Sequence, residues 1–131
     1  MRPSLLLDTH VLLWWLLKPS KLSRPAYRSI QRADVRVSVI SLWEISLKRE
    51  HRKLSLPEGG LHSLVEAQQF QILPLHSAHV QAAADIGGLH ADPYDRLLVG
   101  TARAEKMVFV TRDAALLEHA APLLGDLLLE A

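Results

Sequence analysis

Short apolar runs alternate along this chain with longer segments of helical periodicity. The runs are rich in Leu, Val, Ile and Phe, as buried strands are, and occupy Leu5–Leu7, Val35–Ile40, Phe70–Leu75, Met107–Thr111 and Leu127–Leu129. The segments between them predict helices over His10–Leu17, Arg24–Ala33, Leu42–Arg52, Leu61–Gln69, Ala78–Ile86, Pro93–Lys106 and Ala114–His119. Strands that alternate with helices predict an α/β fold with a parallel sheet covered on both faces.

Length and composition narrow the class of protein. A chain of 131 residues, 49% of them hydrophobic, predicts a single domain over residues 1–131. No apolar run approaches the ~20 residues that span a bilayer, and the first residues lack a cleavable signal pattern. Cysteine is absent, which excludes disulfides and thiolate metal sites and fits a reducing cytoplasm, so we expect a cytoplasmic protein.

The net charge of only +1 does not identify a polyanion-binding protein, but the basic residues are unevenly distributed. They form two clusters: Lys18, Lys21, Arg24, Arg28, Arg32 and Arg36, then Lys48, Arg49, Arg52 and Lys53. Such clusters either meet phosphates or form solvated helix faces, and charge alone favours neither interpretation.

Four acidic residues follow or adjoin the predicted strands. Asp8 follows the first strand, Asp113 follows the fourth, Glu44 lies one turn into the helix after the second, and Asp95 lies in the first turn of the helix before the fourth. In open parallel sheets, ligands bind beyond the carboxyl ends of the strands. The sequence therefore predicts that these four acids meet at one edge of the sheet.

Each acid also has a purely structural interpretation. Asp8 and Asp113 can cap the helices that follow them, and Glu44 can pair with Lys48 one turn away. Asp92, followed by proline, is fully explained as a helix cap. Asp95 is harder to explain in this way, because it shares a helix face with the apolar stripe expected to pack on the sheet.

A cluster of carboxylates needs a counter-charge. Two like charges ~4 Å apart repel by about 1 kcal/mol in water and ~4 kcal/mol at an effective dielectric of 20. A hard divalent cation relieves this repulsion, and Mg²⁺ takes carboxylate and phosphate oxygens. We therefore expect a Mg²⁺ site.

Other candidate motifs are weaker. The pairs around His76–His79 and His90–Asp92 resemble metal-ligand spacings, but they have too few partners for a zinc site and are expected to be solvated turn residues. Neither a glycine-rich phosphate loop nor a nucleophile elbow is present. Trp14, Trp15 and Trp43 are expected in the core, and the helix His10–Leu17 is apolar enough for part of it to face another chain.

Four stretches together resemble the PIN domain family, specifically the VapC-type ribonuclease toxins. They are LLLDTHVLLWWL, SVISLWEISLK with the following KLSLP, HADPYDRLLVGTA, and VFVTRD, and they span nearly the whole chain. The resemblance implies a three-layer α/β/α fold, Mg²⁺- or Mn²⁺-dependent endonucleolytic cleavage of RNA, a homodimer, and inhibition by a VapB-like antitoxin. Tyr94 stands where relatives often carry Phe, and Gly100-Thr101 replaces a better helix-forming pair, but neither departure removes an acid.

Carried over by this resemblance, the metal-binding and catalytic site falls on Asp8, Glu44, Asp95 and Asp113. Thr9 and Thr111 fall where the family often keeps hydroxyl groups near the site. Lys48, Arg49 and Arg112 are expected from their positions to follow the RNA backbone.

Two other functions remain as alternatives. One is a non-catalytic RNA- or protein-binding module with a relict site, which the complete set of acids argues against. The other is a phosphotransfer or phosphatase domain, which needs a nucleophilic aspartate near the metal with a lysine at a neighbouring strand end, and the third strand supplies no such aspartate.

Overall fold

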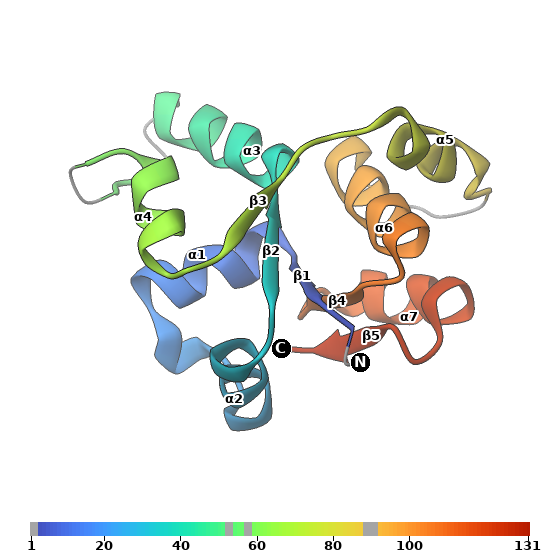
Figure 1. Ribbon diagram of the computed structural model, residues 1–131, viewed down its shortest axis with the longest axis horizontal. Helices are drawn as coiled ribbons and strands as arrows, with labels where there is room; N and C mark the ends of the chain where they lie inside the picture. Colours follow the sequence, from blue (N-terminus) through green and yellow to red (C-terminus); the bar gives the residue numbers. More distant parts are fainter. Residues whose placement is uncertain (1–2, 52–53, 57–58, 88–91) are drawn as a thin grey trace.

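The computed structural model describes residues 3–51, 54–56, 59–87 and 92–131, and it has one parallel sheet between two layers of helices (Figure 1). The five strands lie in the order β3-β2-β1-β4-β5. Their bounds are β1 Leu5–Leu7, β2 Val35–Ser38, β3 Gln71–Leu73, β4 Val108–Thr111 and β5 Leu128–Glu130. All four strand pairings are parallel, so the predicted parallel sheet is confirmed.

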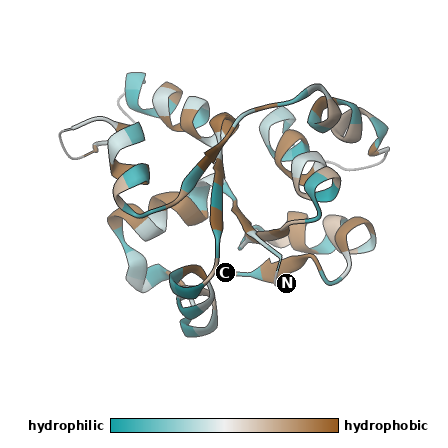
Figure 2. Cartoon of the chain, in the orientation of Figure 1, coloured by the Kyte–Doolittle hydropathy of each residue, from teal (hydrophilic) through white to brown (hydrophobic). Residues whose placement is uncertain are grey.

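Helices cover both faces of the sheet. One layer holds α1 Thr9–Leu17, the 3₁₀ turn η1 Pro19–Lys21, α2 Arg24–Arg32, α3 Val39–Glu50 and α4 Leu61–Ala67. The other holds α5 Ser77–Asp85, α6 Pro93–Glu105 and α7 Ala114–Leu124. Each layer has its own hydrophobic core cluster, and hydrophobic residues run through the strands and the adjoining helix segments in Figure 2. None of the helices in the described ranges is long and apolar enough to cross a membrane.

The centre of the sheet positions the first acid. β1 lies between β2 and β4, and its three leucines are buried because both faces of the sheet are covered. Asp8 follows directly, and its backbone N–H donates to the carbonyl of Val110 on β4 (2.9 Å). The carboxyl ends of β1 and β4 therefore hold Asp8 beside the loop that carries Asp113.

Two helix boundaries differ from the sequence-based prediction by three residues or more. The helix expected from Leu42 begins at Val39, because the Ser38 hydroxyl accepts a hydrogen bond from the N–H of Ile40 (3.0 Å) and caps it. The helix expected to end at His119 continues through Pro122 to Leu124, which is buried. In both cases apolar packing and capping override the local pattern of the sequence.

Two predictions about individual side chains are wrong. Trp43, expected in the core, is 57% exposed on α3. His79, expected in a solvated turn, is fully buried in α5. Its Nδ1 accepts from the His76 N–H (3.1 Å), so Nε2 carries the proton and donates to Glu105 of α6 (2.7 Å). His79 is a bridge between two helices, whereas His90 lies outside the described residues.

A glycine sets the distance between those two helices. A Cβ atom at Gly100 of α6 would lie 2.6 Å from the backbone nitrogen of Ala83 in α5. Any larger residue there would push the helices apart. This close approach explains why Gly100 stands where the resemblance leads one to expect a better helix former.

Candidate active site

Asp8 is 3% exposed, and both of its carboxylate oxygens accept hydrogen bonds. Oδ1 accepts from the N–H of Thr9 (2.7 Å), which caps α1, and Oδ2 accepts from the hydroxyl of Thr111 (2.8 Å). Burial raises the pKa of Asp8, and these hydrogen bonds, with the nearby His10, oppose the rise. The carboxylate is therefore fixed in position at the end of β1.

Glu44 reaches the same edge of the sheet from α3. Its Oε1 accepts from the hydroxyl of Thr9 (2.8 Å), which also lies 2.9 Å from the hydroxyl of Ser41. Thr9 has one hydroxyl proton, which goes to the carboxylate, so Ser41 must donate to Thr9. Lys48 lies 3.6 Å from Glu44 Oε2, which confirms the predicted pairing one turn away.

Asp113 follows β4 and caps α7. Its Oδ1 accepts from the N–H of Leu116 (3.0 Å), and its own N–H donates to the Thr111 hydroxyl oxygen (3.2 Å). That hydroxyl therefore connects Asp8 with the Asp113 loop. Thr9 and Thr111 are both buried, and their hydroxyl groups orient the acids, while direct contact with substrate stays a prediction for both.

Asp95 differs from the other three acids. It is half-buried in the first turn of α6, and its carboxylate accepts no hydrogen bond and forms no ion pair within the described part of the chain. Burial raises its pKa to about 7, helped by the negative charges of Asp8, Asp92, Glu44 and Asp113. Asp95 therefore carries the largest uncompensated repulsion of the site.

The neighbours of Asp95 follow the predicted helix face. Leu98, Val99 and Ala102 are fully buried, as the apolar stripe predicted. Asp92 caps α6 by accepting from the N–H of Asp95 (2.8 Å), also as predicted. Arg96 points away from the site and donates to the carbonyls of Ala83 (2.9 Å) and Ile86 (3.1 Å) at the end of α5.

The four acids thus share one electrostatic environment. Within the described ranges, no three His, Asp or Glu side chains are close enough together to hold a metal. The donor set, made of carboxylate oxygens with hydroxyl support, fits a hard divalent cation rather than zinc.

A small cavity of about 220 Å³ opens beside two of these acids. It is lined by Asp8, His10, Trp14, Arg112 and Asp113. Of the basic residues expected to follow RNA, Arg112 lines this cavity, Lys48 is paired with Glu44, and Arg49 is exposed near the end of α3. His10 and Trp14 were not among the predicted site residues, and only their closeness to Asp8 in the sequence points to them.

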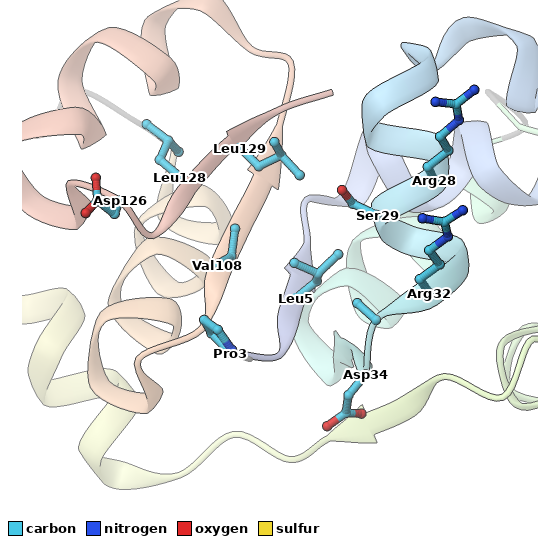
Figure 3. Close-up of a pocket in the computed structure, with 11 residues that line it drawn as sticks. Pro3, Leu5, Arg28, Ser29, Arg32, Asp34, Val108, Asp126, Leu128 and Leu129 are labelled. Carbon is cyan, nitrogen blue, oxygen red and sulfur yellow. The ribbon is translucent and has the colours of Figure 1, made fainter. Parts of the chain in front are cut away.

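A larger cavity, of about 540 Å³, lies at the opposite edge of the sheet, where β1, β4 and β5 begin (Figure 3). Its floor includes Leu5, Val108 and Leu128, and none of the four acids lines it. Cavity volume alone would place the site in this larger cavity, whereas the acids place it at the smaller cavity.

Known proteins resemble this chain over nearly its whole length. The PIN domain family matches residues 5–122. Ribonuclease VapC22 of Mycobacterium tuberculosis is 34% identical over 124 residues, which cover 91% of this chain and 94% of the relative.

Solved structures share the fold. The VapBC2 structure from Rickettsia felis, bound to a promoter DNA fragment, matches with a TM-score of 0.67 at 16% identity and covers 98% of this chain and 97% of that one. The FitAcB structure from Neisseria gonorrhoeae matches with a TM-score of 0.60 at 23% identity and covers 88% and 92%. The three-layer fold expected from the sequence is confirmed. The family match and the similarity to VapC22 show that this chain belongs to the PIN domain family, among its VapC-type ribonucleases.

Proposed function

We propose that this protein is a divalent-metal-dependent endoribonuclease that hydrolyses RNA phosphodiester bonds at the edge formed by Asp8, Glu44, Asp95 and Asp113. The observation that carries the proposal is the state of Asp95. Its carboxylate is half-buried, has no hydrogen-bond partner in the described residues, and is repelled by the charges of four other acids. A site that concentrates unpaired negative charge is stabilised by a cation. The likeness to ribonuclease VapC22 supports RNA as the substrate.

The four acids would hold Mg²⁺ or, alternatively, Mn²⁺. When bound, such an ion supplies Lewis-acid polarisation of the scissile phosphate and a more acidic water molecule. Asp8 and Glu44 are held in place by the hydroxyls of Thr111 and Thr9, so their oxygens need little rearrangement. Asp95, which has no such support, would contribute its carboxylate from the first turn of α6, and Arg112 lines the cavity where a substrate phosphate would enter.

Cleavage of a mixed RNA substrate tests the proposal. We expect cleavage with Mg²⁺ or Mn²⁺ and none with EDTA, and we expect Asp8→Asn and Asp95→Asn to abolish it while the fold is kept. Asp92→Asn is the matched control, since it makes the same change three residues away and asparagine caps a helix as well as aspartate does. Full activity in Asp95→Asn would refute the site, and a wild-type protein that binds RNA without cleaving it would favour the binding-module alternative.

We further propose a VapB-like antitoxin as protein partner. The support is that similar folds have been solved as VapBC2 and FitAB assemblies with DNA fragments. A single domain acting on cellular RNA would work in the cytoplasm, and the homodimer implied by the family stays a prediction. Co-purification with the product of a neighbouring short gene, together with loss of RNA cleavage in that complex, tests the partner, and an unchanged cleavage rate in the complex would contradict it.

A further inference from the structure

The segment between Asp8 and Asp34 contains no acidic residue. It forms α1, η1 and α2, and its basic residues are Lys18, Lys21, Arg24, Arg28 and Arg32. By contrast, Arg36 and Lys48, which follow this segment in the sequence, are each paired with an acid. Within the described part of the chain, none of the five forms an ion pair, so this segment carries most of the available positive charge of its layer.

One end of the segment lies at the mouth of the acidic cavity. Trp14 lines the cavity, and its ring has the guanidinium of Arg112 at 5.6 Å and the ammonium of Lys21 at 5.8 Å from its centre. Arg112 also donates a hydrogen bond to the carbonyl of Lys21. The loop after β4 is thus tied to η1, and Lys21 is placed next to the site.

The row of cations continues along α2. The N-terminus of α2 is anchored where the N–H of Ser23 donates to the carbonyl of Ala131 (2.8 Å). Arg24, Arg28 and Arg32 follow at intervals of four residues, which places them on one face of the helix, about 6 Å apart along its axis.

The three arginine side chains form a continuous surface. Arg24 and Arg28 line one surface cavity, and Arg28 and Arg32 line the next, where Figure 3 shows them one above the other on the same side of α2. The opposite face of the helix buries Ala26 and Ile30 against the core, so this face of arginines is held toward solvent.

We propose that Lys21, Arg24 and Arg28, continued by Arg32, form a phosphate-binding track that carries the RNA strand away from the cleavage site. This proposal rests on the ribonuclease function proposed above. A phosphate backbone that approaches several carboxylates is repelled, so nearby cations must offset the repulsion. Lys21 lies beside the cavity, the arginines of α2 continue from it toward the opposite edge of the sheet, and none of them forms an ion pair within the described residues. Guanidinium groups bind phosphate with two parallel hydrogen bonds. An acidic protein surface would use the same charges but would not need a track that begins at the cavity.

Fluorescence anisotropy with a labelled single-stranded RNA in EDTA tests the track without cleavage. The variant is Arg24→Gln with Arg28→Gln, and the matched control is Arg103→Gln with Lys106→Gln, which removes two exposed cations at the end of α6. Each phosphate contact contributes about −0.7 to the slope of log affinity against log salt for a single strand. We therefore expect the slope to become shallower by about 1.4 and the affinity in ~0.1 M salt to fall roughly 10- to 30-fold in the variant, with neither change in the control.

Cleavage kinetics separate this proposal from the proposed function. With Mg²⁺, the variant should raise KM for a long RNA while kcat and the melting temperature change little. A variant that binds RNA with wild-type affinity and salt slope would overturn the track. This holds even if the variant binds poly-glutamate, a probe for an acidic protein surface, less tightly. Cleavage of RNA by the wild type would still support the ribonuclease function in that case. A wild type that does not cleave RNA, with weakened binding in the variant, would overturn the function and support the track.

Discussion

Replacing Asp95 by asparagine should make the metal-free protein more stable while it destroys the proposed activity. The substitution keeps the size of the side chain and the backbone N–H that Asp92 caps, and it removes only the charge. The pKa of Asp95 rises from 3.8 to about 7 on folding, because of burial and four neighbouring carboxylates. The ionised form is therefore disfavoured in the folded state.

The gain in the free energy of unfolding follows from that rise in pKa. A change of one in pKa corresponds to about 1.4 kcal/mol, so the gain is at most about 4 kcal/mol at pH 8. Asp95 is only half-buried, and screening by solvent reduces the expected gain to about 1–2 kcal/mol. For a domain of this size that gain raises the melting temperature by roughly 4–7 °C.

The stability gain of Asp95→Asn increases as the pH rises. Folded Asp95 binds its proton more tightly than unfolded Asp95, so the wild type loses stability as the pH rises from about 4 to about 7. The advantage of Asp95→Asn should therefore be largest at pH 8, smaller at pH 5, and absent near pH 4. Added Mg²⁺ should raise the melting temperature of the wild type more than that of the variant, because the ion stabilises the charged site.

Thermal unfolding followed by circular dichroism, in EDTA at pH 4, 5 and 8, measures these effects. Glu118→Gln is a control, since it removes an exposed carboxylate on α7. An Asp95→Asn protein that melts at or below the wild-type temperature at pH 8, with the control unchanged, would show that the carboxylate is not electrostatically strained and would refute the reasoning.

Three further substitutions have expected effects on stability or activity. Thr111→Val should lower cleavage about 10- to 100-fold in a gel assay, because Asp8 loses its hydroxyl donor, whereas Thr111→Ser should keep most of the activity, and equal rates would contradict this role. Gly100→Ala should destabilise the protein by about 1–3 kcal/mol in urea denaturation, because its Cβ meets the Ala83 backbone, while Gly87→Ala, which meets nothing within 4 Å, should cost less than half as much. Arg96→Ala should cost about 1–3 kcal/mol in the same assay through the loss of its hydrogen bonds to the Ala83 and Ile86 carbonyls, and an equal loss in the exposed Arg103→Ala would refute that explanation.

The sequence predicts the sheet and the position of the acids well because both depend on local patterns. A buried parallel strand is an apolar run, and a residue that follows such a run lies at the carboxyl edge of the sheet, so Asp8 and Asp113 could be placed in advance. Asp95 could be noticed because a charge at the tip of an apolar helical stripe contradicts its surroundings.

Contacts between distant parts of the chain could not be predicted in this way. The Thr111 hydroxyl reaches Asp8 across 103 residues, and no periodicity records such a contact. Nothing in the sequence around His79 indicates that this side chain is buried with Glu105 as its hydrogen-bond partner. The need for glycine at position 100 is evident only from its close approach to Ala83. Trp43 was misplaced because aromatic composition says nothing about which side of α3 meets the core.

The central place of β1 between β2 and β4 has a consequence for how the protein is made. β2 follows β1 closely in the chain, but β4 and the Asp113 loop come from its last quarter. During synthesis, a nascent chain in which Thr111 has not yet left the ribosome has an open sheet edge beside β1. Such a chain also lacks one hydroxyl donor to Asp8. The proposed site therefore becomes complete only after β4 and Asp113 have been synthesised and β4 has paired with β1.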